Sequence, residues 1–239
     1  MYFLKKLDWD TKFFNYPSYR LQLNSELNSN ELEDLVDILN KKGFYTIQCK
    51  SGIQKNISWI SENTKAVLVD VNMQFINKLS INYSDSFDDD IKIENNFPYN
   101  DAIISFISSG FNYSRFINDV NINNDKALNV YVEWMKNAFD KEDKYFSIYS
   151  IENKTLGVIL FSIDKFQNSI VLELVCVNKK FQSMGIGTKI IKSIFSYAKR
   201  HTIKNIKVGT QLNNISAINF YINNGFLVND VYYTFHLWI

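Results

Sequence analysis

The C-terminal part of the chain, from residue 144 onward, has the most regular pattern of hydrophobic and polar positions. Two runs rich in β-forming residues, 145–151 and 156–163, flank a turn-prone break at 152–154, which predicts a hairpin. A third run, 169–177, is nearly continuous in apolar residues, a pattern typical of a strand buried on both faces. Three consecutive strands are therefore expected.

Two helices with a strand between them are expected next. Apolar residues recur at helical spacing up to about His201 and again over about 214–224, and the run 206–210 between them is β-rich. Gly225 is placed to end the second helix, and strands are expected from Phe226 to Ile239. The resulting order, βββαβαββ, predicts the α/β class, with an α+β type of mixed sheet.

The N-terminal part repeats a portion of this order in weaker form. Residues 44–50 and 66–75 resemble strands, with a weak helix between them. Residues 47–75 can be laid on 207–235 without gaps, at an offset of 160. Four positions are then identical: Asn63, Asp70, Val71 and Phe75 fall on Asn223, Asp230, Val231 and Phe235. We interpret the N-terminal lobe as a partial copy of the C-terminal unit.

Two domains are predicted on this basis. An N-terminal, substrate-side lobe covers residues 1–100 and a second domain covers 101–239, with an Asp-, Asn- and Ser-rich connecting loop at 80–100. In the partial copy Ser61 replaces Tyr221, so we expect this lobe to lack the chemistry described below.

Composition and charge argue against several classes of protein. With 239 residues the chain is one large or two small domains. Its 26 Lys and Arg residues balance 25 Asp and Glu residues, which argues against a nucleic-acid binder held by bulk electrostatic attraction. Two histidines and two cysteines leave little room for a zinc site, so no metal is expected. No apolar run of about 18 residues occurs, so we expect a cytoplasmic protein without a membrane partner.

A glycine-rich turn at 182–187 lies between the predicted buried strand and a helix. Free backbone N–H groups at a helix start attract anions, so the turn is a candidate phosphate site. A P-loop would require glycine where Phe181 or Gln182 stands, and a dinucleotide fingerprint would require a small residue in place of Ile190. Both of these alternatives fail on spacing.

The spacing that remains resembles the GNAT superfamily of N-acetyltransferases. Its signature Q/R-x-x-G-x-G/A is matched by Gln182, Gly185 and Gly187. Its second signature, an Asn-x-x-Ala-x-x-Phe-Tyr helix ending in Gly-Phe, is matched by Asn214, Ala217, Phe220, Tyr221, Gly225 and Phe226. The resemblance implies the GNAT acyl-CoA N-acyltransferase fold in 101–239, a partial GNAT unit in the N-terminal lobe, and acetyl-CoA as co-substrate.

A closer resemblance extends over nearly the whole chain. Residues 7–14, the stretch 114–116 with Tyr131 and Trp134, and the ending 235–239 are similar to bacterial nucleotide-amino-sugar N-acetyltransferases of the dTDP-fucosamine type. This implies direct transfer, in a ternary complex, to the amine of a dTDP-linked amino-deoxy sugar for surface glycan synthesis. These motifs are less specific than the GNAT signatures.

The same resemblance assigns the residues that hold acetyl-CoA. Its diphosphate is expected on backbone amides around the glycine turn, and its pantetheine amides on the edge of the strand ending at 177. Asn214 is either a helix cap or a CoA contact. The full set is Val175, Val177, Gln182, Ser183, Met184, Gly185, Ile186, Gly187, Thr188 and Asn214.

Two residues are candidates for proton transfer. Tyr221 is the expected general acid, because a phenol with a reference pKa of about 10 stays protonated at pH 7; the alternative is a core tyrosine. Many GNAT enzymes carry a carboxylate where Val171 stands, and Glu173 shares that strand face. Glu173 is therefore a candidate base, with a rim ion pair and water as the base as open alternatives.

The residues expected to bind the acceptor are assigned from their side-chain chemistry. Arg115 is expected to hold a phosphate, because a lone arginine in an aromatic stretch requires a partner. Trp9, Phe13 and Phe14 either stack on the acceptor or pack one lobe on the other. His236 is a further candidate contact, with a structural histidine as its alternative.

Other functions stay open at this point. A GNAT enzyme can instead act on a protein N-terminus, a polyamine or an antibiotic, and a degenerate domain can bind acyl-CoA without catalysis. A homodimer is compatible with the sequence, which does not determine the oligomeric state.

Overall fold

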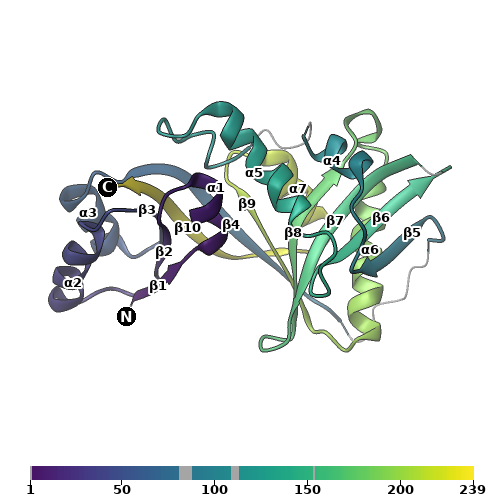
Figure 1. Cartoon of the computed structure of the whole chain (residues 1–239). Helices are drawn as coiled ribbons and strands as arrows, with labels where there is room; N and C mark the ends of the chain where they lie inside the picture. The colour runs from purple at the N-terminus through teal and green to yellow at the C-terminus, as the bar shows by residue number, and fades with distance from the viewer. Residues whose placement is uncertain (1, 81–87, 109–112, 153) are drawn as a thin grey trace.

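The computed structural model describes residues 2–80, 88–108, 113–152 and 154–239. In these residues ten strands form one mixed sheet in the order β1-β2-β3-β10-β4-β9-β8-β7-β6-β5 (Figure 1). The strands are β1 (Tyr2–Lys6), β2 (Ser18–Leu23), β3 (Phe44–Lys50), β4 (Val67–Lys78), β5 (Ile91–Asn95), β6 (Tyr145–Ile151), β7 (Lys154–Asp164), β8 (Ser169–Val177), β9 (Asn205–Gln211) and β10 (Leu227–Trp238). The pairs β2/β3 and β8/β9 are parallel, and the other neighbours are antiparallel.

Helices cover both faces of this sheet. They are α1 (Asp8–Phe14), α2 (Ser29–Leu39), α3 (Gln54–Asn63), α4 (Asp101–Ser108), α5 (Asn124–Lys136), α6 (Ile186–Arg200) and α7 (Ile215–Asn223), with a short 3₁₀ helix at Lys179–Phe181. Alternate residues of β7 divide the core, because Val158 and Leu160 pack toward α4 and α5 while Ile159 and Phe161 pack toward α6 and α7. Helices α2 and α3 cover the N-terminal end of the sheet (Figure 1).

The predicted mixed α/β class is confirmed, and most C-terminal elements lie where the pattern predicts. The strands expected at 145–151 and 169–177 have the expected bounds, and those expected at 156–163 and 206–210 lie within β7 and β9. Gly225 follows α7 with a φ of +79°, a left-handed conformation that glycine adopts readily at the end of a helix.

Two expectations require correction. One continuous strand, β10, replaces the separate strands expected after Phe226, because two shifts of register against β4 absorb the irregular positions as bulges. The loop expected at 80–100 contains β5, whose Ile91 and Ile93 pack on the core while its acidic surroundings disguise the alternation. Residues 81–87 of that loop, and Asn153 of the expected hairpin turn, lie outside the described residues.

The elements of the predicted repeat correspond at the offset of 160. The bounds of β4 and β10 coincide at that offset, and α3 corresponds to α7 within one residue. Their pairing is symmetric as well: Leu227 pairs with Ile76 just as His236 pairs with Val67, and Tyr232 pairs with its own counterpart, Asn72. This register supports the prediction of a partial GNAT copy in the N-terminal lobe.

The last strands of the two units are exchanged. β10 lies between β3 and β4, and β4 lies between β10 and β9 (Figure 1). A boundary at residue 100 therefore divides the chain but not the sheet. In the N-terminal unit β2 pairs with β3 along its whole length, so these two strands stay closed together.

Candidate active site

The sheet opens between β8 and β9. Within the described residues these parallel strands pair from Ser169 to Leu172 of β8 and no further. The next residue, Glu173, is a bulge, because its two neighbours on β8 pair with consecutive residues of β7. β9 pairs with β4 along its whole length, but its pairing with β8 stops at Val208, so the edge of β8 that faces β9 has unpaired backbone groups through Val177. A cavity of about 410 Å³, here called the inner cavity, lies in this gap.

The inner cavity brings several predicted site residues together. Those that line it are Arg115, Glu173, Val175, Asn214 and Tyr221. Tyr221 comes from α7, Glu173 and Val175 from β8, and Arg115 from the segment before α5. Residues about a hundred positions apart in the chain therefore share one site.

Tyr221 is buried at the wall of the inner cavity. Its ring packs against Phe75 and Phe226, with ring centroids 5.6 and 5.7 Å away. No hydrogen bond joins its hydroxyl to another described residue. Burial raises the pKa of Tyr221 well above its ordinary value of 10, so the phenol keeps its proton at neutral pH. Tyr221 is therefore a core tyrosine at the cavity wall, and its role as a proton donor stays a prediction.

Glu173 forms the ion pair that was one of its two predicted alternatives. Its carboxylate accepts a hydrogen bond from the Trp134 indole N–H at 3.2 Å and lies 2.5 Å from the Lys144 ammonium. The carboxylate is thereby fixed at the wall that it shares with Tyr221. Its role as a base stays a prediction.

Gly185 and Gly187 are each required in the turn for a different physical reason. Gly185 has a φ of +78° and open space where a Cβ would lie, so the backbone conformation requires it. A Cβ on Gly187 would lie 2.9 Å from the Phe220 ring, so close packing of α6 on α7 requires that glycine. The sequence interpretation, which gave both glycines to phosphate approach and backbone freedom, did not foresee this contact.

The start of α6 offers hydrogen-bond donors. Gly185 gives this helix no side-chain cap, and no acidic residue occupies its first turn. Gln182 donates from Nε2 to the Val177 carbonyl at 3.1 Å, which ties the turn to the end of β8. The predicted turn residues, 182–188, do not line the inner cavity, and the side chain of Ile186 is buried in the core. Because the helix start is uncapped and has no acidic residue, its backbone N–H groups can bind an anion.

Asn214 acts as the helix cap that was one of its two predicted roles. Its Oδ1 accepts a hydrogen bond from the Ala217 backbone N–H at 3.2 Å, at the start of α7. Val175 and Val177 pack their side chains toward α6 and α7, which leaves their backbone groups for any ligand at the free edge.

A second cavity of about 540 Å³, here called the outer cavity, adjoins the first. Arg115, Trp134 and Arg20 line both. Trp9 lines the outer cavity and stacks on Phe13 at 5.1 Å. Arg20, on β2, was missed from the sequence, where the only signal is that arginine is rare in this chain.

Three predicted acceptor residues line neither cavity. Phe13 and Phe14 pack in a cluster that joins the lobes, which was the structural alternative for them. His236 is 2% exposed, and its Nδ1 lies 2.7 Å from an Asp119 carboxylate oxygen that also accepts a hydrogen bond from Trp238. Burial lowers the pKa of His236 to about 4, so it stays neutral. The structure therefore places it as a structural histidine.

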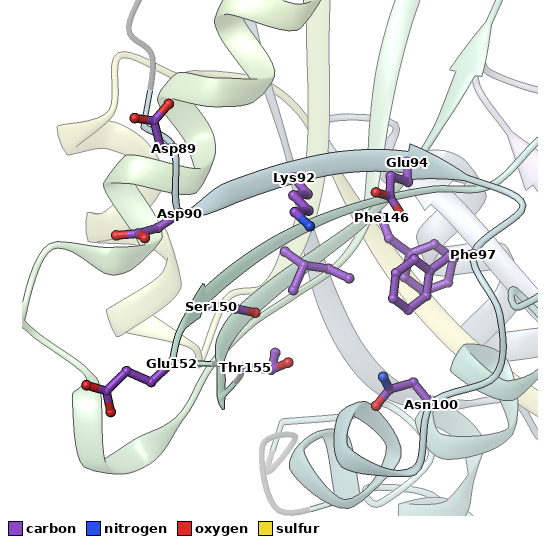
Figure 2. A pocket seen from close by; sticks show the side chains of 11 residues that line it. Asp89, Asp90, Lys92, Glu94, Phe97, Asn100, Phe146, Ser150, Glu152 and Thr155 are labelled. Atoms are coloured by element: carbon purple, nitrogen blue, oxygen red, sulfur yellow. The ribbon is translucent and has the colours of Figure 1, made fainter.

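Figure 2 shows a further cavity, of about 450 Å³, beside β5 and β6. Asp89, Asp90 and Glu94 line it together with Lys92, and none of the predicted site residues does. In the described part of the chain no group of three or more His, Cys, Asp and Glu side chains could hold a metal. No described helix is long and apolar enough to cross a membrane.

Comparisons with known proteins agree with this geometry. The model of the Acetyltransferase (GNAT) family matches residues 118–226. The spore coat polysaccharide biosynthesis protein SpsD of Bacillus subtilis (strain 168) is 24% identical over 139 residues, which are 58% of this chain and 47% of that protein. Streptothricin acetyltransferase A of the same organism is 27% identical over 92 residues, 38% of this chain and 53% of that protein. Each match spans about half the length of the relative.

A solved structure extends the likeness to the whole fold. The GCN5-related N-acetyltransferase from Sphaerobacter thermophilus matches with a TM-score of 0.63 and 10% identity, over 99% of this chain and 76% of that one. At this identity the match shows a shared fold. The glycine turn, the open edge of β8 and the family match thus agree: residues 118–226 are similar to the Acetyltransferase (GNAT) family.

Proposed function

We propose that the protein transfers the acetyl group of acetyl-CoA to the amine of a nucleotide-linked amino-deoxy sugar, with dTDP as the nucleotide, for surface glycan synthesis. The observation that carries this proposal is the inner cavity, where Tyr221 and Glu173 share a wall with Arg115 at the gap between β8 and β9. The similarity to SpsD, which is named for spore coat polysaccharide biosynthesis, supports a sugar acceptor.

The residues around the gap fit acetyl-CoA. The uncapped start of α6 offers backbone N–H groups to a diphosphate, and the unpaired edge of β8 through Val177 offers hydrogen bonds to amide groups. Acetyl-CoA supplies a thioester carbonyl that an amine can attack. Because both reactants lie in one cavity, much of the barrier is lowered by proximity, for which effective molarities reach about 10⁵ to 10⁸ M.

Proton transfer is assigned to two side chains of the inner cavity. The C–N bond forms as the C–S bond breaks, and Tyr221 gives its phenolic proton to the departing sulfur. Its raised pKa keeps that proton available across the neutral range. Glu173, fixed by Trp134 and Lys144, takes the proton that the amine loses, directly or through water.

The test is thiol release from acetyl-CoA with a panel of acceptors. We expect turnover with a dTDP-linked amino sugar and little with spermidine, a peptide N-terminus or streptothricin. The streptothricin arm is included because of the similarity to streptothricin acetyltransferase A. Turnover with the other amines alone would reject the sugar acceptor, and CoA binding without any turnover would indicate a non-catalytic module.

Tyr221→Phe tests the proton donor. We expect kcat to fall by about 10²- to 10⁴-fold, as for loss of a general acid, with little change in acetyl-CoA affinity. Tyr197→Phe is the matched control, because Tyr197 is a tyrosine of α6 that packs on the same core and lines neither cavity. An unchanged kcat for Tyr221→Phe would remove the acid role.

A further inference from the structure

Two arginines from opposite parts of the chain meet where the inner and outer cavities adjoin. Arg20 comes from β2 in the N-terminal lobe, and Arg115 from the segment that precedes α5. Each of them lines both cavities, as does Trp134 of α5. The junction between the cavities is therefore built from both lobes.

The identity of these two residues is itself informative. The chain has 26 lysines and arginines, of which only Arg20, Arg115 and Arg200 are arginine. Arginine presents a planar fork of donors that binds a phosphate or carboxylate in two places, whereas lysine is a point charge. Two of the three forks in the chain occur at one junction.

Neither guanidinium forms a hydrogen bond or an ion pair with another described residue. The Nε atoms of Arg20 and Arg115 are buried and have no hydrogen-bond partner, and no ion pair to either residue is formed within the described residues. The guanidinium of Arg115 lies over the Phe116 ring, 4.2 Å from its centroid, which fixes its plane without satisfying its donors. Buried donors without partners are costly, so a ligand is expected to complete them.

The nearby carboxyl groups do not occupy these donors. Asp10 lines the outer cavity, and Asp70 on β4 is near enough to Arg115 for the arginine charge to lower its pKa. Burial nonetheless raises the pKa of both carboxyls above their ordinary value, that of Asp70 to about 6. Burial and the charge of Arg115 in turn lower the pKa of Arg20, as expected for two like charges held together. The guanidinium groups thus stay open to a stronger anion.

We propose that Arg20 and Arg115 together bind the diphosphate of the acceptor, with its nucleoside in the outer cavity and its amine in the inner cavity. Two forks match a group with several anionic oxygens better than a single carboxylate. The outer cavity has a volume within the usual range for small-molecule sites and an indole wall at Trp9 for an aromatic base. This assignment rests on the proposed function and adds that the N-terminal lobe supplies half of the anion site.

Binding of dTDP, measured by calorimetry in the absence of acetyl-CoA, tests the pair. We expect Arg20→Gln and Arg115→Gln each to weaken dTDP binding by about 10- to 100-fold. Arg200→Gln removes the third arginine, at the end of α6, and is expected to change the Kd less than twofold. The Kd for CoA should stay unchanged in all three variants, because its diphosphate is assigned to the start of α6.

The melting temperature of each variant shows whether a loss of dTDP binding comes from misfolding. If the arginines bind a ligand, either substitution relieves like-charge repulsion, so the melting temperature is expected to stay equal or rise. Arg115→Lys, which keeps the charge and loses the fork, should fold normally and bind dTDP less tightly than the wild type. A lower melting temperature with an unchanged Kd would assign the arginines to the fold and overturn the proposal.

Two outcomes separate this proposal from the proposed function. Arginine-dependent dTDP binding without acetylation of any amino sugar would reject the activity and keep the site. Acetylation of a dTDP-amino sugar with an unchanged KM in both arginine variants would keep the activity and overturn the site. Weakened CoA binding with unaffected dTDP binding would assign the pair to the donor, and would overturn it as well.

Discussion

Substitution of Gly187 by alanine tests whether the glycine turn is required for helix packing. The new Cβ would lie 2.9 Å from Cε2 and 3.1 Å from Cζ of Phe220. Ordinary contacts of this kind exceed 3.4 Å, so the ring has to retreat by roughly half an ångström or more. Phe220 packs edge-on against Tyr221, with ring centroids 5.4 Å apart, so this movement carries the proposed acid with it.

We expect Gly187→Ala to lower the free energy of unfolding by about 1–3 kcal/mol, the usual penalty for overpacking. Urea denaturation measures this loss, and steady-state kinetics should show a lower kcat. Phe220→Leu, which removes the clashing ring edge, should restore part of both in the double variant. The reasoning would be refuted by a stable Gly187→Ala protein, or by a double variant no better than the single one.

Gly185→Ala is the matched control within the same turn. Its φ of +78° makes any side chain unfavourable by about 1–2 kcal/mol, but no atom lies within 4 Å of the new Cβ. Phe220→Leu should therefore fail to rescue Gly185→Ala. Rescue of both variants alike would show that the two glycines do not differ in the way described.

Three further predictions concern the carboxylates. Glu173→Gln should lower kcat at least tenfold in steady-state assays. Lys144→Met breaks the same ion pair but should leave kcat within a few-fold of the wild type. Equal losses of kcat in the two variants would show that Glu173 is only an ion-pair partner. Asp119→Ala removes the acceptor of two buried ring N–H groups and should lower the free energy of unfolding by about 3 kcal/mol in urea; a loss below about 1 kcal/mol would contradict this. The Asp70 pKa of about 6 lies above its ordinary 3.8, so the stabilising contribution of Asp70 is complete below pH 3.8 and is lost as the pH rises through 6. Asp70→Asn should thus gain about 2 kcal/mol on the wild type between pH 4 and 7, and a constant difference across that range would count against the raised pKa.

The strands that the sequence predicts best are those whose burial depends on little else. The run from Ser169 to Val177 is apolar enough to be a strand in any context, and its bounds are as expected. The bulge at Glu173 is different, because it exists only relative to the neighbouring strand β7. The same holds for β10, whose irregular positions are absorbed by its pairing with β4. The local hydrophobic pattern predicts whether a segment forms a strand, whereas the pairing register of that strand also depends on the neighbouring strand.

The candidate site divides in the same way. The glycine turn and Tyr221 belong to motifs whose residues lie close together in the chain, so the amino-acid sequence alone locates them. Arg20 is not located in this way, because an arginine in a strand shows its partner only when distant segments are brought together. The buried pair of Asp119 and His236 is likewise separated by 117 positions, and neither residue type indicates on its own whether it binds substrate or supports the fold.

The exchange of β4 and β10 has a consequence during synthesis of the chain. β4 is complete at Lys78, but both of its neighbours, β9 and β10, begin only at Asn205 or later. At about 5–20 residues per second the ribosome takes roughly ten seconds to supply them. Until then the nascent N-terminal half presents a twelve-residue strand with two bare edges, a surface prone to aggregation. This protein is therefore expected to depend on chaperones more than its size suggests, and to fold only once its last strand has left the ribosome.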